Sequence, residues 1–358
     1  MIHRHRSPFL AIALIAALPA GTAAAQSVPG FVVSTYAPDV PGPVHLAFAP
    51  DGTLYCGRDF STTGSITPQR LTRIGPGGAP VEDYGIDPTP DPDPAVVDVL
   101  GLASGVPGSV LTGGVKVFPS VGSISAVRPD QSVVELWSSN EWPNPGEMKF
   151  DVDGRLVFVD LELRNVWQVI PGGAPTLLAG MPGNLQPSHL AIAPDGRLLV
   201  STITGPVVEL ASDGTLLNAA YAAFPARVAI EFGPGGQWGT DLYALRLAAG
   251  TLHRVSPGGT ITQVGSGFGG SPFDIAFGPD GRLHVSRITA SDVLVIEPEA
   301  CSCNPAKPED LDCSGTVDGG DLGLLLGAWG SGECAADLDG SGVVDGADLG
   351  ILLGAWGT

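Results

Sequence analysis

The stretch HLAIAPDGRLLVST (residues 189–202) decides the fold of this chain. Apolar and polar residues alternate on both sides of Pro194-Asp195-Gly196, a combination typical of a tight turn. Two alternating runs joined by such a turn predict a β-hairpin, because successive side chains of a strand point to opposite faces.

Four further segments repeat this pattern of alternating run, turn and alternating run. They are HLAFAPDGTLYCG (45–57), EMKFDVDGRLVFVD (147–160), RVAIEFGPGGQWGTDLYAL (227–245) and DIAFGPDGRLHVSR (274–287). Their spacing is roughly 40 residues, except for the first interval, which is long enough for one more copy. The segment DVLGLASGVPGSVLTGG (98–114) fills that interval with a degenerate turn. Six repeats of four short strands predict a mainly β fold, a six-bladed β-propeller over residues 26–300.

The two ends of the repeat region predict how the propeller closes. SDVLVIEPE (291–299) supplies only the third strand of the last blade, whereas FVVSTYAP (31–38) precedes the first hairpin and belongs to no blade of its own. Pairing residues 31–38 as the outer strand of the last blade would close the ring and remove its exposed edges. An open two-sheet sandwich, the alternative, predicts neither the regular period nor the orphan strand.

Alignment of the repeats by their first residues predicts a set of polar residues around the central channel. At the start of each innermost strand stand His45, Asp98, Glu147, His189, Arg227 and Asp274. Two histidines and three carboxylates around a channel are suited to a divalent metal that polarises a substrate. The alternative is a solvated channel in which paired charges keep the blades in register.

The phrase APDGRLLVS (193–201) resembles NHL-type and gluconolactonase/regucalcin-like propellers. The resemblance implies a propeller fold over residues 26–300. Gluconolactonase-like enzymes use a Glu, an Asn and an Asp at blade starts as metal ligands. Glu147, Asp98 and Asp274 match the carboxylates of that set, while no Asn occupies the predicted ring.

The N-terminal segment indicates export, and the charge of the chain excludes nucleic-acid binding. The formal net charge is −20, and no basic run offers the surface that a nucleic-acid backbone requires. Residues 1–25 combine a basic start, an apolar run and Ala23-Ala24-Ala25 before a plausible cleavage point, which predicts a signal peptide. No other stretch is long enough to span a bilayer. We therefore expect a secreted or cell-surface protein without a membrane span after cleavage.

Two copies of an acidic loop predict two calcium sites at the end of the chain. DLDCSGTVDGGDLGLLLGAWG (310–330) and DLDGSGVVDGADLGILLGAWG (337–357) differ at four positions. A calcium loop needs oxygen ligands at positions 1, 3, 5, 7, 9 and 12 and a glycine at position 6. The predicted ligands are Asp310, Asp312, Ser314, Thr316 (carbonyl), Asp318 and Asp321 in the first loop, and Asp337, Asp339, Ser341, Val343 (carbonyl), Asp345 and Asp348 in the second.

Each acidic loop leads into a short apolar helix, and no helix is predicted before it. Leucines recur at helical spacing, so two helices packed face to face, with Trp329 and Trp356 at their ends, would form a small core. A tandem of loop and exiting helix resembles the type I dockerin over residues 301–358. That resemblance implies a calcium-dependent docking module for a cohesin-like partner, although loop positions 10 and 11 are the nearly featureless Gly319-Gly320 and Gly346-Ala347.

Four cysteines cluster near these loops. In an exported protein, Cys301, Cys303, Cys313 and Cys334 suggest disulfides in one of three possible pairings. A zinc site is disfavoured, because Cys301 and Cys303 are too close in sequence and no histidine is near.

Two functions of different class follow from these patterns. In the first, the C-terminal module tethers a propeller that binds a glycan or a protein. In the second, the same module carries a metal-dependent propeller enzyme, such as a lactonase or a polysaccharide-active hydrolase or lyase. A metal bound in the propeller would discriminate between them.

Overall fold

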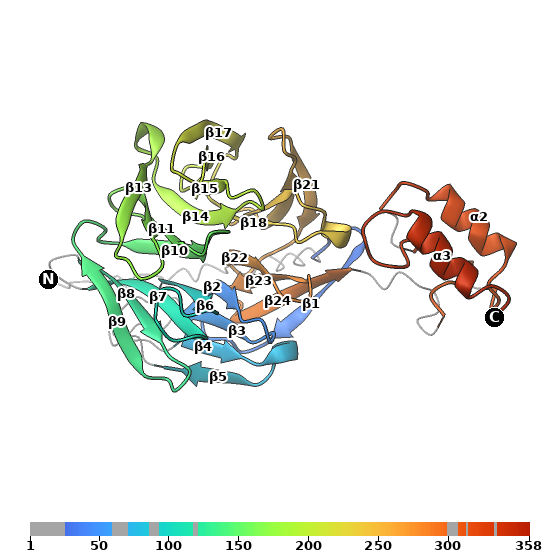
Figure 1. Cartoon of the computed structure of the whole chain (residues 1–358), viewed down its shortest axis with the longest axis horizontal. Coiled ribbons are helices and arrows are strands. Elements are labelled where there is room, and N and C mark those ends of the chain that lie inside the picture. Colours follow the sequence, from blue (N-terminus) through green and yellow to red (C-terminus); the bar gives the residue numbers. More distant parts are fainter. Residues whose placement is uncertain are drawn as a thin grey trace, which may run out of the picture.

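The computed structural model describes residues 26–58, 71–85, 93–116, 121–298, 307–312, 314–332 and 335–358. Within these ranges the chain forms six four-stranded antiparallel sheets, followed by two short helices. Figure 1 shows the six sheets arranged as blades around a centre, with the helices to one side. The predicted fold class, mainly β with a six-bladed propeller, is confirmed. The predicted signal peptide and the cysteines 301, 303, 313 and 334 lie outside the described residues.

Each blade runs outward from an innermost strand. The innermost strands are β2 (Pro43–Phe48), β6 (Asp93–Asp98), β10 (Pro145–Phe150), β14 (Pro187–Ile192), β18 (Val228–Phe232) and β22 (Pro272–Phe277). The second strands are β3 (Leu54–Arg58), β7 (Ser109–Lys116), β11 (Leu156–Asp160), β15 (Leu198–Thr202), β19 (Leu242–Arg246) and β23 (Leu283–Arg287). The third strands are β4 (Leu71–Ile74), β8 (Val121–Val127), β12 (Asn165–Val169), β16 (Pro206–Leu210), β20 (Thr251–Val255) and β24 (Asp292–Pro298). The outer strands are β5 (Val81–Tyr84), β9 (Val133–Ser139), β13 (Thr176–Gly180), β17 (Leu216–Ala223), β21 (Ile261–Ser266) and β1 (Phe31–Ala37).

The hairpin that opens the fourth blade forms as its sequence predicts. The Arg197 carbonyl accepts a hydrogen bond from Ala193 N–H at 2.8 Å, and Gly196 N–H donates to the Ala193 carbonyl at 2.9 Å. Gly196 has a φ of +86°, which an L-residue rarely adopts, so the glycine is what allows the tight reversal. Asp195 accepts from Arg197 Nε at 2.7 Å, which braces the turn.

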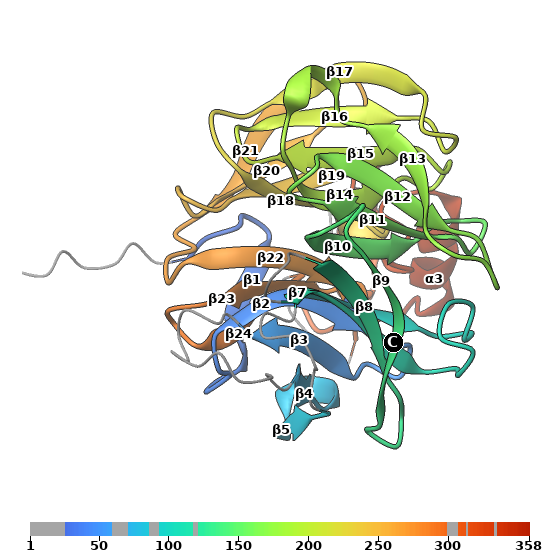
Figure 2. The same ribbon diagram turned by 90° about the vertical axis from the view of Figure 1, so that its left-hand side faces the viewer.

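The ring closes through the N-terminal strand, as predicted. β1 pairs antiparallel with β24 in a register that runs from Phe31↔Pro298 to Ala37↔Val293. Figure 2 shows β1 among the strands β22–β24 of the same blade. The first and last strands of the propeller therefore hold each other, and β1 covers the outer edge of β24.

The core lies between the blades rather than within any one of them. Between the fourth and fifth blades, for example, Leu199 and Val207 belong to one buried cluster with Val228 and Ile230. The innermost and second strands are buried on both faces, whereas β13 and β17 on the outside are mostly exposed. Each blade thus buries its apolar surface only when both neighbours are present.

The two C-terminal copies interlock around a small core. Their helices are α2 (Gly319–Gly327) and α3 (Gly346–Gly354). Gly330 N–H donates to the Val344 carbonyl and Gly357 N–H donates to the Val317 carbonyl, so each loop pairs with the turn after the other helix. Val317, Leu325, Val344 and Leu352 are fully buried in this core.

The tryptophans do not take part in that core, contrary to the prediction. Trp329 and Trp356 are 48% and 46% exposed, and Leu326 and Leu353 are 52% and 50% exposed. Leu325 and Leu352 face the core, and the next residue along each helix, Leu326 or Leu353, is turned about 100° away from it. Among the described residues, no helix has both the length and the apolar character that a bilayer span requires.

Candidate functional site

Five of the six innermost strands carry a bulge at the same place, and this bulge positions the channel residues. The pairing with the second strand is interrupted between Pro43 and Leu46 in the first blade, and at the equivalent places in β6, β10, β14 and β22. A bulge locally bends the strand and redirects a side chain. In β2, β10, β14 and β22 a proline stands first, where no ladder hydrogen bond is lost.

Four of the predicted channel residues come together at these bulges. His45, Glu147, His189 and Asp274 are between 0% and 5% exposed, and we call these four residues the channel ring. One ligand atom from each of His45, His189 and Asp274 lies within 4.8 Å of the others. The rings of His45 and His189 have their centroids 5.3 Å apart.

Asp98 is not part of the channel ring. It ends β6 instead of beginning it, and its carboxylate accepts hydrogen bonds from the N–H groups of Leu102, Ala103 and Ser104 at 2.7 to 3.0 Å. The turn of this blade spans residues 99–108 and is longer than the others, so alignment of the repeats by their first residues misplaced this strand. The register of β6 puts residue 95, an alanine, at the ring position.

Arg227 also lies outside the channel ring, at the mouth of the channel. It precedes β18, and the pairing of β18 with β19 has no bulge. Phe232 pairs with Leu242 just as Phe150 pairs with Leu156, and counting back from these pairs places Ala229 opposite Leu245 at the ring position. The fifth repeat has two more residues between its first residue and its turn, which shifts Arg227 outward.

The ring carboxylates join neighbouring blades. Glu147 Oε2 accepts from Leu190 N–H of the next blade at 2.8 Å, and Asp274 Oδ2 accepts from Leu46 N–H of the first blade at 2.8 Å. Ser201 acts similarly, since its hydroxyl donates to the Val228 carbonyl at 2.7 Å. These bonds support the interpretation in which channel polar groups hold the blades in register.

His189 is a neutral imidazole with one nitrogen engaged. Its Nδ1 lies 2.9 Å from Ser188 Oγ, and Arg227 Nε donates to the same hydroxyl oxygen. Burial, followed by the positive charge of Arg227, lowers the pKa of His189 well below its usual value. Its buried Nε2 has no hydrogen-bond partner in the described part of the chain. Metal binding by Nε2 requires Nδ1 to carry the proton, and Ser188 Oγ then accepts from both Nδ1 and Arg227.

A lysine that the sequence reasoning missed lies just below the channel ring. Lys149 forms an ion pair with Glu231 and lies 3.5 Å from Glu147 Oε1. Burial raises the pKa of Glu147 to about 7, against the opposing effect of Lys149. Burial acts to lower the pKa of Lys149, but Glu231 and Glu147 outweigh it and raise that pKa. These groups line a cavity of about 180 Å³ that also reaches His45 and Asp274.

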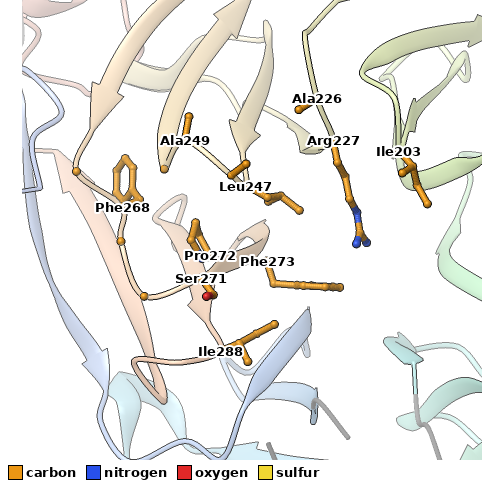
Figure 3. A pocket seen from close by; sticks show the side chains of 15 residues that line it. Ile203, Ala226, Arg227, Leu247, Ala249, Phe268, Ser271, Pro272, Phe273 and Ile288 are labelled. Atoms are coloured by element: carbon orange, nitrogen blue, oxygen red, sulfur yellow. The ribbon is translucent and has the colours of Figure 1, made fainter. Parts of the chain in front are cut away.

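A larger pocket of about 840 Å³ opens at the mouth of the channel, and we call it the mouth pocket. Figure 3 shows Arg227 extending toward its middle, with Phe273 below it. The guanidinium carbon of Arg227 lies 4.7 Å from the centre of the Phe273 ring. Phe273 contacts His45 and His189 edge-on, at centroid distances of 5.0 and 5.8 Å. Phe273 therefore stands between the mouth pocket and the buried histidines.

The C-terminal loops gather their predicted ligands in two equivalent clusters. Carboxylate oxygens of Asp310, Asp312 and Asp321 lie within 4.8 Å of one another, as do those of Asp337, Asp339 and Asp348. Ser314 and Ser341 each donate to the carbonyl at loop position 7, that of Thr316 or Val343, at 3.1 Å. Both loops thus bring oxygen atoms of positions 1, 3 and 12 together, and such a set suits Ca²⁺.

The carboxylates at positions 9 and 12 also begin the helices. Asp318 caps α2 by accepting from Gly320 N–H, and Asp321 accepts from Asp318 N–H at 2.7 Å. Asp345 and Asp348 form the same capping box on α3. Backbone hydrogen bonds outweigh the effect of burial and lower the pKa of Asp321 and Asp348, so both are ionised near neutral pH.

No family model and no curated protein sequence matches the chain. Solved structures match over the propeller. A gluconolactonase from Xanthomonas campestris is 15% identical with a TM-score of 0.58, over 76% of this chain and 91% of that chain. The PQQ-bound aldose sugar dehydrogenase from Streptomyces coelicolor is 15% identical with a TM-score of 0.57, over 76% and 99%. Virginiamycin B lyase from Staphylococcus aureus is 13% identical with a TM-score of 0.53, over 75% and 99%. At such identities the likeness concerns the fold alone: this propeller is related in fold to gluconolactonases and sugar dehydrogenases.

Proposed function

We propose that this chain is an exported protein whose C-terminal module binds two Ca²⁺ ions and docks a ligand-binding propeller onto a partner protein. The observation that carries the proposal is the duplication of both parts of the module. Each copy has a three-carboxylate cluster, and each exposes apolar side chains toward the far end of the helix that follows it. We call these patches the docking patches; they consist of Leu326 and Trp329 in the first copy, and Leu353 and Trp356 in the second, which are three positions apart and so share a side.

Calcium would stabilise the module by neutralising its loops. Three carboxylates held within 4.8 Å repel one another, and Ca²⁺ turns that repulsion into attraction. The core of the module is too small to stabilise so short a segment by apolar burial alone. Metal binding therefore contributes directly to the folding of the module.

The docking patches are better suited to contact with a protein partner than to exposure to solvent. Their side chains are 46% to 52% exposed although all four are large and apolar. Exposed apolar side chains grouped on one element are typical of interaction surfaces. The first turn of each helix carries only glycine or alanine at loop positions 10 and 11. A cohesin-like or cell-surface protein would therefore contact the docking patches instead. Two equivalent patches permit binding in two orientations.

The test of this proposal is calcium titration of the full chain by calorimetry. We expect two bound ions in the wild type, one in each of Asp321→Asn and Asp348→Asn, and two in Glu141→Gln, an exposed control on the propeller. A panel of cohesin domains then tests docking with calcium and with chelator. Leu326→Asp combined with Leu353→Asp should abolish any binding found. Fewer than two ions in the wild type contradicts the calcium sites, and absence of cohesin binding excludes that class of partner.

The channel ring favours a second candidate function, a metal-dependent propeller enzyme acting as a lactonase, hydrolase or lyase. His45, His189 and Asp274 converge within 4.8 Å, and two imidazoles with one carboxylate suit a divalent transition metal. A bound metal would supply Lewis-acid polarisation of a substrate oxygen. Glu147, whose pKa burial raises, is placed to take up or release a proton beside it. Phe273 must move for substrate to reach this site from the mouth pocket.

Metal content decides between a structural and a metal-binding channel ring. The full chain is equilibrated with Zn²⁺ or Mn²⁺ plus excess Ca²⁺, dialysed, and analysed by elemental mass spectrometry. One transition metal per chain that is lost in His189→Ala and retained in His253→Ala, a histidine of β20 outside the ring, supports the enzyme. Absence of metal in the wild type would indicate that the channel ring only holds the blades in register.

A further inference from the structure

The turn between β18 and β19 is larger than the matching turns of most other blades. It runs over residues 233–241, whereas the matching turn of the fourth blade runs over residues 193–197. Its backbone closes on itself, because Gly235 N–H donates to the Gly239 carbonyl at 2.9 Å. We call residues 233–241 the β18–β19 loop. The fifth blade therefore presents more surface than the fourth at this end of the propeller.

Trp238 anchors the β18–β19 loop to the core of the propeller. Its side chain is 3% exposed, and the centre of its ring lies 4.1 Å from that of Phe31 and 5.2 Å from that of Phe277. The Tyr243 hydroxyl donates a hydrogen bond to the Trp238 carbonyl at 2.6 Å. Because these contacts hold the loop in place, it offers a fixed surface to the segment that lies against it.

The second acidic loop of the C-terminal module lies against the β18–β19 loop. A β-carbon on Gly342 would stand 2.6 Å from the Gly236 carbonyl oxygen, so only glycine at position 342 allows this approach. A β-carbon on Gly236 would stand 3.6 Å from the Gly340 carbonyl oxygen. Residues 234–238 also line a cavity of about 600 Å³ together with Asp337 and Gly340. Figure 1 shows the module, in red, beside this yellow loop, and the two loops touch through their backbones.

The first acidic loop has no equivalent contact in the part of the chain that the structure describes. Gly315 stands at the same loop position as Gly342, and their φ angles are +93° and +89°. A β-carbon on Gly315 would nevertheless meet no described heavy atom within 4 Å beyond residues 314–316. The two copies differ in sequence at only four positions, so the difference comes from which copy faces the propeller. Loops that are nearly identical in sequence are thus unequal in their surroundings.

We propose that the second acidic loop is the surface through which the C-terminal module docks onto its own propeller, with the β18–β19 loop as its partner, and that the first acidic loop takes no part in this contact. The contact joins neutral backbone groups, so it depends on the shape of the second loop. One consequence rests on the proposed calcium sites: the ion in the second loop, unlike the ion in the first, holds the module against the propeller.

The carboxylate cluster of the second loop controls the shape of the contact. Gly342 N–H donates to Asp337 Oδ2 at 2.7 Å, and Asp337 shares its cluster with Asp339 and Asp348. Calcium would hold Asp337 in place, whereas repulsion among the three carboxylates without calcium would displace Asp337 and Gly342 with it. Because coupling between two binding events is reciprocal, the contact in turn raises the calcium affinity of the second loop.

The experiment measures calcium affinity by calorimetry on the full chain after a change on the propeller side of the contact. Gly236→Asn adds a side chain there, at a φ of +59° that asparagine adopts more readily than most residues. In the Asp321→Asn background, where only the second loop binds calcium, we expect the affinity to fall by about fivefold or more. In the Asp348→Asn background, which reports on the first loop, the affinity should not change. Gly172→Asn, at a φ of +73° and with no described heavy atom within 4 Å of its β-carbon position, is the matched control and should change neither affinity.

Amide hydrogen exchange gives a second readout that needs no change in the propeller. At saturating calcium, we expect the β18–β19 loop to exchange faster in Asp348→Asn than in Asp321→Asn, because only Asp348→Asn removes the ion that holds the contact. Residues 193–197 should exchange equally in both variants. If Gly236→Asn fails to fold, this comparison decides. If an aspartate variant unfolds the whole module, Gly236→Asn alone decides, since it should weaken the binding of one of the two ions and spare the other.

Two results overturn the proposal while two ions still bind. They are an affinity of the second loop that Gly236→Asn leaves unchanged or lowers no more than that of the first, and equal exchange of the β18–β19 loop in the two aspartate variants. The proposed calcium sites survive both results. If the wild type binds fewer than two ions, the calcium proposal fails, and exchange of residues 337–348 in Gly236→Asn decides on the contact itself. Faster exchange than in the wild type supports the contact, and unchanged exchange overturns it.

Discussion

The channel ring and the calcium loops both assemble carboxylates, but they do so over very different distances in the sequence. Each calcium loop draws its cluster from twelve consecutive positions, as in Asp310, Asp312 and Asp321. The channel ring takes His45 from the first blade, His189 from the fourth and Asp274 from the sixth. A local site depends on the spacing of residues, whereas a site made of distant blades depends on where each strand begins and bulges.

This difference predicts that the two sites respond to different perturbations. The channel ring needs the closed propeller, whereas the acidic loops, on the calcium proposal, need only the tandem repeat and its ions. Four experiments test the separation, in decreasing order of expected effect.

Removal of residues 26–38 should have the largest effect, because it opens the ring. The deletion exposes the edge of β24 and takes away Val28, Tyr36 and Ala37, which are buried. We expect the propeller to melt more than 10 °C lower, or to aggregate, as losses of several kcal/mol produce. Calorimetry measures the transition, with Ser34→Ala, an exposed position of β1, as control. Calcium stoichiometry should persist; an unchanged melting temperature would contradict closure by β1.

Chelation of calcium should unfold the C-terminal module and spare the propeller. Without the ions, the carboxylates of each loop repel and the helices α2 and α3 are too short to persist. Hydrogen exchange resolved by peptide should show complete loss of protection over residues 319–327 and 346–354, with unchanged protection in β14 and β15. Retained helix protection in excess chelator would show that the module folds without metal.

Asp98→Asn should destabilise the second blade without affecting the channel ring or the C-terminal loops. The asparagine side chain has one oxygen in place of two, so at least one N–H of residues 102–104 loses its acceptor. The loss should lower the free energy of unfolding by about 1 to 3 kcal/mol. Urea denaturation of the propeller measures the loss, with Glu141→Gln as control. A change in channel metal binding in Asp98→Asn would argue for a role in the ring that its position at the end of β6 does not support.

The pH dependence of propeller stability should carry the smallest signal. The pKa of Glu147 is raised from 4.5 to about 7 in the folded state, so its stabilising effect is present below pH 4.5 and lost as pH rises through 7. The pKa of His189 is lowered, so its contribution is present above pH 6.5 and lost as pH falls.

Glu147→Gln removes the first of these two opposing effects. Relative to the wild type, the variant should gain stability on the order of 1 kcal/mol between pH 5 and pH 8. The control Glu82→Gln, at an exposed position of β5, should show no such gain. Parallel melting curves of wild type and Glu147→Gln across this range would place the Glu147 pKa at its ordinary value.

Local chemistry in the sequence determined the hairpins, the number of blades and the carboxylate clusters of the two acidic loops. The Pro-Asp-Gly turns repeat because glycine accepts the positive φ seen at Gly196 at the lowest steric cost, and that preference is visible residue by residue. The oxygen atoms that cluster in each loop were equally predictable, since a twelve-residue loop is short enough for residue spacing to determine which oxygens meet. The place of β1 was also predictable, because the last blade has only three strands of its own and a closed ring needs a fourth.

Only the tertiary structure decided which polar residues share the channel. Asp98 and Arg227 begin their repeats, yet one ends a strand and the other precedes one, because turn length and bulges shift the register. Counting back from the turn would have found Lys149 and Glu231 as equivalents, since each stands one residue before the phenylalanine that ends its strand. The place of Phe273 between pocket and histidines, and the exposure of Trp329 and Trp356, depend on packing between distant segments, which residue spacing does not encode.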